Sequence, residues 1–227
     1  MGFPDGSGIE VVVERLDARE DPRAVHESRV LLSDEERDRA ERFAFDRDRN
    51  RYILARSRLR RLIATRLGME PTSIELTYGE QGKPALAPRH AGSDLCFNVS
   101  HSNDVVAYVF ARRREVGIDV EAIRAMPDAD SIATRYFSRA ENEAYLALDP
   151  EDKLQGFFNC WTRKEAFVKA LGEGLGYPLA QFDVSLAPGE PARILRFQGK
   201  PGNACGWHLD AFCPVPGYVG AVVVGEG

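Results

Sequence analysis

The stretch Tyr136-Phe-Ser138-Arg-Ala-Glu141 repeats, about 105 residues later, the pattern of the stretch Leu31-Leu-Ser33-Asp-Glu-Glu36. Each stretch contains Ser-x-x-Glu, the pattern of a capping box, in which the serine and the glutamate bond to each other's backbone amides. Both stretches therefore predict the start of a helix. Two such starts, one in each half of a 227-residue chain, predict two halves with one plan.

The segments around the two capping boxes follow the same order in both halves. A strand candidate precedes each box, a long helix candidate follows it, and further strands close each half. The strands before the boxes are predicted at 9–14 and 116–120, and the long helices at 49–67 and 154–171. The closing strands are predicted at 74–78, 95–99 and 105–111 in the first half and at 182–186, 194–197, 207–212 and 218–224 in the second.

We therefore expect an α+β fold of two similar subdomains in tandem, related by a pseudo-twofold axis. Each subdomain would have a mostly antiparallel sheet packed against its long helix. We expect the junction near 112–115, with an N-terminal subdomain of residues 1–112 and a C-terminal subdomain of residues 113–227. A duplicated chain leaves a cleft between its halves, a usual place for a ligand. Because one chain builds both walls of that cleft, we expect a monomer.

Composition and charge narrow the class of function. Hydrophobic residues make up 44% of the chain and charged residues 29%, as in globular proteins. The net charge of −5 argues against a nucleic-acid surface, although arginines cluster between 47 and 66. No stretch approaches the roughly 18 to 20 apolar residues of a membrane span, and the N-terminus lacks a signal-peptide pattern. We expect a cytoplasmic protein without nucleic-acid or membrane partners, whose basic patch suits a small anion.

The second predicted long helix carries charges on an otherwise apolar surface. Its inward stripe consists, by helical spacing, of Phe157, Trp161, Val168 and Leu171. Lys164 falls on that same stripe, and Glu165 stands four residues before Lys169 along one edge. A surface ion pair and a reactive site both fit this helix when it is taken alone.

The predicted strand Gly117-Ile-Asp119-Val-Glu121 sends both carboxylates to one face, because side chains alternate along a strand. Paired carboxylates suit Mg²⁺, and a third ligand could come from Glu165. The plain alternative is the solvated face of an antiparallel sheet.

The run Phe97-Asn98-Val99-Ser100-His101-Ser102 is predicted to end a strand in polar groups. Serine, asparagine and turn amides can donate to phosphate oxygens, and histidine can add a donor or a charge. The alternative for His101 is a turn residue with a local hydrogen bond. A serine nucleophile is set aside, because neighbours on a strand face opposite ways and no G-x-S-x-G elbow is present.

Two further segments could contact an anion. Gly79-Glu-Gln-Gly82-Lys83-Pro84 predicts a tight turn, in which the proline biases Lys83 toward an extended backbone. Arg51 opens the first long helix after a run of alternating charge. An exposed hairpin turn and a solvated helix start explain the two segments at least as well.

Taken in order, these segments resemble one family, the phosphopantetheinyl transferases of the two-subdomain, Sfp-like type. The resemblance spans about residues 33 to 182 and so covers most of both halves. It rests on Gly82-Lys83-Pro84, Phe97-Asn98-Val-Ser100-His101, Gly117-Ile-Asp119-Val-Glu121 and Trp161-x-x-Lys164-Glu165-Ala166-x-x-Lys169, followed by Gly172-x-Gly174-Leu175.

The resemblance implies an Mg²⁺-dependent transferase that moves the 4′-phosphopantetheine arm of coenzyme A to a serine of an apo acyl or peptidyl carrier protein. The products would be the holo carrier and adenosine 3′,5′-bisphosphate. Asp119, Glu121 and Glu165 would hold Mg²⁺ on the pyrophosphate. Glu165 would also be the general base, directly or through water. Lys169 would steady the leaving phosphate, with Lys164 as the other cation near it.

The implied contacts with coenzyme A come from Arg51, Lys83, Pro84, Asn98, Ser100, His101, Lys164 and Lys169, with Ser100 and His101 at the 3′-phosphate. Such enzymes often place basic residues after Leu-Ser-x-x-E, where this chain offers only Arg37 and Arg39, so nucleotide contacts from that segment stay open. The carrier is expected to dock at the cleft rim around 126–137. Fatty acid, polyketide and nonribosomal peptide pathways all stay open. The alternatives are a non-catalytic module that binds coenzyme A or a carrier protein, and a structural α+β protein.

Overall fold

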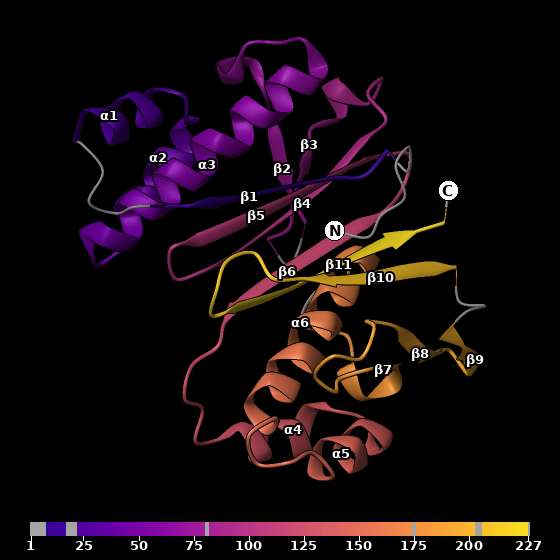
Figure 1. Cartoon of the computed structure of the whole chain (residues 1–227). Coiled ribbons are helices and arrows are strands. Elements are labelled where there is room, and N and C mark those ends of the chain that lie inside the picture. Colours follow the sequence, from indigo (N-terminus) through magenta and orange to yellow (C-terminus); the bar gives the residue numbers. More distant parts are fainter. Residues whose placement is uncertain (1–7, 17–21, 80–81, 174–175, 203–205, 227) are drawn as a thin grey trace.

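The computed structural model describes residues 8–16, 22–79, 82–173, 176–202 and 206–226. Within these ranges the chain forms two α+β halves, one above the other in Figure 1. Glu80 and Gln81 of the predicted turn, Gly174 and Leu175 of the last motif, and the N-terminal residues 1–7 lie outside the described residues. No helix in the described ranges has the length and apolar character required to cross a membrane.

The first half contains three helices and a sheet of three strands in the order β1-β5-β4. A separate hairpin pairs β2 with β3. The elements of this half are β1 (Glu10–Arg15), α1 (Pro22–Val30), α2 (Asp34–Glu41), α3 (Asp46–Leu67), β2 (Leu76–Tyr78), β3 (Pro84–Leu86), β4 (Leu95–Ser102) and β5 (Val105–Arg112).

The second half repeats this plan with a sheet in the order β6-β11-β10. A smaller sheet joins β7, β8 and β9. The elements of this half are β6 (Val116–Ala122), α4 (Ala129–Tyr136), α5 (Arg139–Leu146), α6 (Lys153–Leu171), β7 (Asp183–Val184), β8 (Ile194–Phe197), β9 (Lys200–Pro201), β10 (Trp207–Phe212) and β11 (Tyr218–Gly225).

The two main sheets have equivalent strand orders, because each places its first strand at one edge and its last strand in the centre. All of their strand pairs are antiparallel. Both predicted capping boxes form: Ser33 and Glu36 bond to each other's amides at the start of α2, as Ser138 and Glu141 do at the start of α5. The predicted α+β fold of two similar antiparallel subdomains, each with a long helix, is therefore confirmed.

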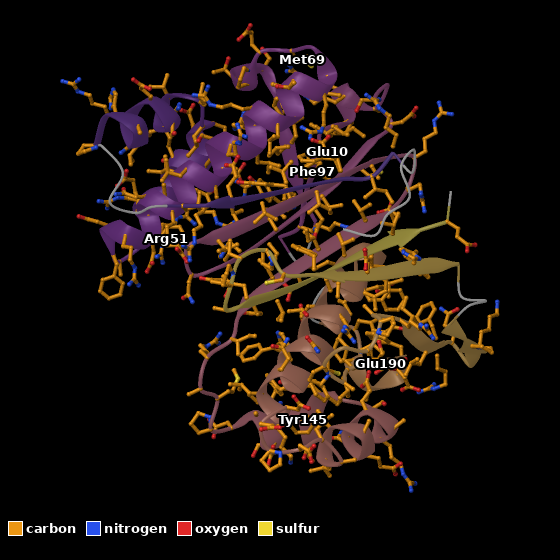
Figure 2. The ribbon with its side chains drawn as sticks, viewed as in Figure 1. Glu10, Arg51, Met69, Phe97, Tyr145 and Glu190 are labelled. Carbon is orange, nitrogen blue, oxygen red and sulfur yellow. The ribbon has the colours of Figure 1, made fainter. Side chains whose placement is uncertain are left out.

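Three apolar clusters hold the layers together. One lies between α3 and the first sheet, where Phe97 packs (Figure 2). A second surrounds α6 and contains the aromatic side chains of Tyr145, Phe157 and Phe167. The third lies between the two sheets and is built from small and branched residues of β5, β6 and β11. Each long helix thus covers the outer side of its own sheet, and the inner sides meet.

The seam between the two sheets is made by side chains of β4. The amides of Ile118, Val120 and Ala122 on β6 donate to the side-chain oxygens of Asn98, Ser100 and Ser102, at 3.0, 3.3 and 3.1 Å. β6 pairs with β11 on one side only. Its other edge would present unpaired amides, and the side chains of β4 satisfy them.

This seam corrects the sequence prediction for β4. The strand was expected to end at Val99 within the polar run, with His101 as a possible turn residue, but β4 continues to Ser102. Polar residues stay in the strand because every second one faces the edge of β6. Strand β2 begins at Leu76, later than the predicted residue 74, because a 3₁₀ turn at Pro71–Ser73 precedes it. Strand β7 is likewise shorter than predicted and covers only Asp183–Val184.

Candidate active site

Strand β6 lies directly against α6, which brings its carboxylates to the helix. A Cβ added at Gly117 would lie 2.0 Å from the carbonyl oxygen of Ala166 and 2.4 Å from the amide nitrogen of Ala170. Only a residue without a side chain permits this approach. The glycine of the Gly117-Ile-Asp119 motif is thus explained by this contact.

The contact places Lys169 of α6 against Asp119 of β6. The Nζ atom of Lys169 lies 2.6 Å from Asp119 Oδ1 and donates to Ser100 Oγ at 3.1 Å. The hydroxyl of Ser100 donates to the same Asp119 oxygen at 2.8 Å. Residues from three elements, 69 positions apart at the extreme, therefore meet at one carboxylate oxygen.

The second carboxylate of β6 is held by the same strand seam. Glu121 Oε2 accepts a hydrogen bond from Ser102 Oγ at 2.7 Å and lies 3.5 Å from Arg124 Nη1. Burial raises the pKa of Glu121, the Ser102 hydroxyl lowers it, and Asp119 raises it.

Glu165 completes an acidic group with Asp119 and Glu121. The residue is 9% exposed, and its Oε1 atom is buried with no hydrogen-bond partner among the described residues. Burial raises the pKa of Glu165 and the charges of Asp119 and Glu121 raise it further, while Lys169 opposes them. Asp119 Oδ2 is likewise buried and unpartnered. Buried carboxylate oxygens are normally paired, so two such atoms in one place mark a site that takes a cation or a donor.

The acidic group fits a hard divalent cation by its chemistry, since Mg²⁺ binds carboxylate oxygens. In the arrangement described, however, Lys169 already occupies one side of Asp119. Within the described residues, no group of three or more His, Cys, Asp or Glu side chains is arranged to hold a metal ion. The three carboxylates are therefore of the right chemical type for Mg²⁺, but they would have to move closer together to bind it.

A cavity of about 670 Å³ opens beside the acidic group, between the two halves. Its walls come from α3, the turn before β3, β4 and the last turns of α6. The ionisable residues that line it are Arg39, Arg47, Asp48, Arg51, Arg56, Lys83, His101, Glu165 and Lys169. Cations outnumber carboxylates among them, although the whole chain is acidic, so the cavity suits an anionic ligand.

The walls from the first half contain two arginines with unused donors. Arg51 lies near the N-terminal end of α3 (Figure 2), and its Nε atom is buried with no partner in the part of the chain that the structure describes. Arg56 Nη1 is also buried and unpartnered. The guanidinium of Arg56 lies 5.6 Å from the ring centroids of both Tyr52 and Tyr78, which hold it in place. These fixed donors would suit a phosphate group.

The sequence analysis missed Arg56 and Tyr52, although it named Arg51. Helical spacing contained part of the signal: Tyr52 and Arg56 are four positions apart and so lie on one face of α3. Of the two arginines left open near α2, Arg39 lines the cavity. Arg37 instead bonds to the Leu32 carbonyl and to Asp34.

The predicted nucleotide contacts on β4 divide between the two faces of the strand. His101 lines the cavity, and partial desolvation and the charge of Lys169 lower its pKa, against the effect of Asp119. Asn98 also lines the cavity, although its Oδ1 atom accepts from Ile118 N. Ser100 does not line it, because its hydroxyl serves Asp119 and the seam.

Lys164 is the one predicted site residue that the structure places elsewhere. It is 0% exposed, and its Nζ atom lies 2.8 Å from Glu141 Oε2, in the core around α6. Five residues separate it from Lys169, which turns the two side chains about 140° apart around the helix. The expectation that Lys164 acts beside the leaving phosphate is therefore corrected. Its place on the inward stripe was the better indication.

The structure thus brings together, around one cavity, Arg51, Lys83, Pro84, Asn98, His101, Glu165 and Lys169. Ser100, Asp119 and Glu121 lie behind this lining and contact it through Lys169 and the seam.

Two family models match the chain. The model described as 4′-phosphopantetheinyl transferase superfamily matches residues 115–223. The model described as 4′-phosphopantetheinyl transferase, N-terminal, matches residues 22–112.

Several known proteins are similar to this chain over different lengths. The 4′-phosphopantetheinyl transferase HetI of Nostoc sp. (strain PCC 7120) is 37% identical over 195 residues, which are 86% of this chain and 79% of that protein. The 4′-phosphopantetheinyl transferase Sfp of Bacillus subtilis (strain 168) is 33% identical over 156 residues, 69% of this chain and 67% of its own. The 4′-phosphopantetheinyl transferase AcpT of Salmonella typhimurium is 43% identical over 112 residues, 49% of this chain and 56% of its own.

Proposed function

The chain belongs to the 4′-phosphopantetheinyl transferase superfamily, and on that premise we propose how its cavity transfers the phosphopantetheine arm of coenzyme A to a carrier-protein serine. The serine oxygen attacks the phosphorus that bears the pantetheine. The bond from that phosphorus to the bridging oxygen breaks, and adenosine 3′,5′-bisphosphate leaves. The observation that supports this reading is the cationic cavity that ends at the buried carboxylates of Asp119 and Glu165.

Coenzyme A would enter the cavity with its nucleotide end toward the first half. Arg51, Arg56 and His101 offer donors to its phosphates, and Pro84 offers an apolar wall. The Nη1 donor of Arg56 favours a phosphate monoester over water, because this atom is already buried and held in place. Its pyrophosphate would then lie toward α6, near Lys169.

The acidic group would hold Mg²⁺ through Asp119, Glu121 and Glu165. When bound, this ion supplies positive charge that stabilises the pyrophosphate oxygens in the transition state. Its support here is the pair of buried, unpartnered oxygens on Asp119 and Glu165. The dependence on a divalent metal, and on Mg²⁺ in particular, is part of the proposal.

Glu165 would take the proton of the carrier serine. Its raised pKa brings it nearer to neutral pH, where a base combines the correct protonation state with proton affinity. Lys169 would place its ammonium on the leaving phosphate, which requires it to turn from Asp119. Both residues reach the cavity from one edge of α6.

The partners would be coenzyme A and an apo carrier protein. We propose that the carrier docks on the rim formed by residues 126–137, which include α4, and that residues 1–112 and 113–227 act as the nucleotide-contacting and catalytic subdomains. We also propose a cytoplasmic monomer. The comparisons give no support to a non-catalytic binding module, and the three carboxylates argue against it.

The test is the intact mass of an apo carrier protein after incubation with this protein, coenzyme A and MgCl2. A gain of one phosphopantetheine unit is expected, and EDTA should abolish it. Added MgCl2 should restore it. No gain on fatty acid, polyketide and peptide carriers would contradict the activity, and a gain that persists in EDTA would contradict the metal.

A further inference from the structure

The side chain of Lys83 crosses from the first half of the molecule to the second. Its Nζ atom donates to the carbonyl oxygen of Lys169 at 2.5 Å and to that of Val116 at 3.5 Å. Lys169 lies in the last turn of α6, and Val116 opens β6. One ammonium therefore touches the backbone of both elements that carry the acidic group.

The contact with Lys169 falls where a helix needs donors. The last carbonyls of a helix have no amide partner within it. The amide of Gly172, which ends α6 with a φ of +77°, donates to Val168, not to Lys169. A cation at this end also interacts favourably with the helix dipole. Lys83 thus fixes the backbone of the residue whose own side chain faces Asp119.

The position of Lys83 itself is set by a closed turn. The amide of Gly79 donates to the Lys83 carbonyl at 3.0 Å, and the amide of Gly82 donates to Gly79 at 2.8 Å. Gly82 has a φ of +74°, which glycine adopts without strain. Pro84 follows at once and opens β3. This turn also lines the cavity, so the same residue faces the ligand space and the reacting end of α6.

The Lys83 side chain is partly buried. Burial lowers the pKa of Lys83, and the nearby charge of Glu115 opposes that effect. A cation removed from water keeps its proton only with good hydrogen-bond acceptors, and the two carbonyls provide them. Replacing the ammonium by an apolar group would leave both carbonyls without this donor.

We propose that Lys83 is a positioning residue, which holds the end of α6 and the start of β6 so that Lys169 and Asp119 meet the substrate in the reacting geometry. The inference rests on the proposed function. It assigns Lys83 to the rate of the chemical step, whereas a direct phosphate contact would assign it to the affinity for coenzyme A. Lys83 would thus connect the cavity wall of the first half to the elements that carry the reacting groups, β6 and α6.

Lys83→Met tests this assignment, because methionine keeps the apolar stem and removes the ammonium. We expect kcat to fall about tenfold or more, as small displacements of reacting groups do, while KM for coenzyme A changes less than about threefold. Lys83→Arg should recover most of the lost kcat. A raised KM with unchanged kcat would overturn the proposal, and so would an arginine variant as slow as the methionine variant.

Hydrogen exchange gives a readout that does not need turnover. In Lys83→Met, the amides of residues 117–120 and 169–173 should exchange faster than in the unaltered protein, without any ligand. Lys200→Met, the same change at an exposed lysine of β9, is the matched control and should leave these amides unchanged. Equal exchange in the two variants would overturn the proposal. If the unaltered protein transfers nothing, the proposed function fails, and the exchange comparison still decides this inference.

Discussion

The two halves of the chain fix their long helices with the same contact, but with different cations. In the first half, Arg60 of α3 donates from Nε to Glu36 Oε2 at 2.6 Å. Its Nη1 atom donates to the carbonyl of Pro71, the first residue of a 3₁₀ turn, at 3.2 Å, and to that of Ile74, which follows the turn, at 2.7 Å. We call this set of contacts, from capping-box glutamate to helix cation to turn carbonyls, the helix lock.

In the second half, Lys164 of α6 forms the equivalent lock. Its Nζ atom lies 2.8 Å from Glu141 Oε2 and donates to the carbonyls of Leu179 and Phe182 at 2.7 Å each. These carbonyls likewise belong to the first residue of a 3₁₀ turn, Leu179–Gln181, and to the residue that follows it. The counterpart of Lys164 is therefore Arg60.

The locks differ in what else their glutamates touch. Glu36 also lies 3.6 Å from Arg56 Nε and 3.5 Å from the Tyr78 hydroxyl. Arg56 lines the cavity between the halves, and Tyr78 lines a second, neighbouring pocket beside α2. Glu141 accepts instead from the buried amide of Val184, at 2.8 Å. Only the first lock extends toward ligand space. The duplicated framework is thus common to both halves, and the chemistry was added at different positions on it.

The largest effect is expected where the halves differ most, directly after the lock cation. That position is Glu165 in the second half and the exposed Arg61 in the first. Glu165→Gln should lower transfer by about 10³-fold, because the general base is lost, while the protein stays folded. Single-turnover transfer to an apo carrier measures this, with the exposed Glu151→Gln as control. An active Gln variant would mean that the asymmetry of the halves is not catalytic.

Replacing the cation of each helix lock should lower the free energy of unfolding by different amounts in the two halves. Lys164→Met leaves Glu141 buried without its cation, and we expect the free energy of unfolding to fall by about 3–5 kcal/mol. Arg60→Met should cost about 1 kcal/mol less, because Arg56 remains beside Glu36. Urea unfolding of both variants measures the difference. In the double variant Glu141→Gln/Lys164→Met the losses should not add, and additive losses would contradict the lock.

Arg56 tests whether the first lock does extend into ligand space. Arg56→Met should raise KM for coenzyme A about tenfold, equal to about 1.4 kcal/mol, since the unpartnered Nη1 donor is lost, and kcat should change little. Steady-state kinetics with varied coenzyme A measures this. Arg58→Met is the matched control, because Arg58 pairs with Glu14 and does not line the cavity. Equal KM values in the two variants would separate the first lock from the ligand.

The smallest expected effect is a pH dependence of the free energy of unfolding, which comes from Glu165 in the second half and has no counterpart at Arg61 in the first. The pKa of Glu165 is raised by burial and by Asp119, so in the window above the usual glutamate value the folded state binds more protons than the unfolded state. The free energy of unfolding contributed by this group therefore falls as pH rises through that window. Glu165→Gln should lack this slope. Urea unfolding of both proteins, at steps of about one pH unit between about pH 4 and 8, measures the difference. Parallel curves for both proteins would contradict the raised pKa.

Much of the frame was predictable because it depends on local patterns. The two capping boxes, the long helices and the antiparallel strands each leave a signal within a few residues. Helical spacing also put Lys164 on the inward stripe, correctly, where the resemblance placed it in the site. Local patterns and family motifs thus disagreed at one residue, and the spacing proved the better guide.

The rest of the site depends on contacts across the chain. The polar residues of β4 looked like the end of a strand because their partners, the amides of β6, lie about twenty positions away. The carbonyl partners of Lys83 are 33 and 86 residues distant. No periodicity encodes such pairs. The pairing of Tyr52 with Arg56, four positions apart on α3, was within reach of the sequence.

The seam between β4 and β6 has a consequence for how the molecule assembles. The same three β4 residues that satisfy the edge of β6 include the hydroxyls that bond Asp119 and Glu121. A slip by two residues would keep every side chain on its face, yet it would present Ser102 to Asp119 and leave Glu121 without a hydroxyl. The same contacts of β4 therefore dock the two halves and hold the carboxylates of Asp119 and Glu121 in place.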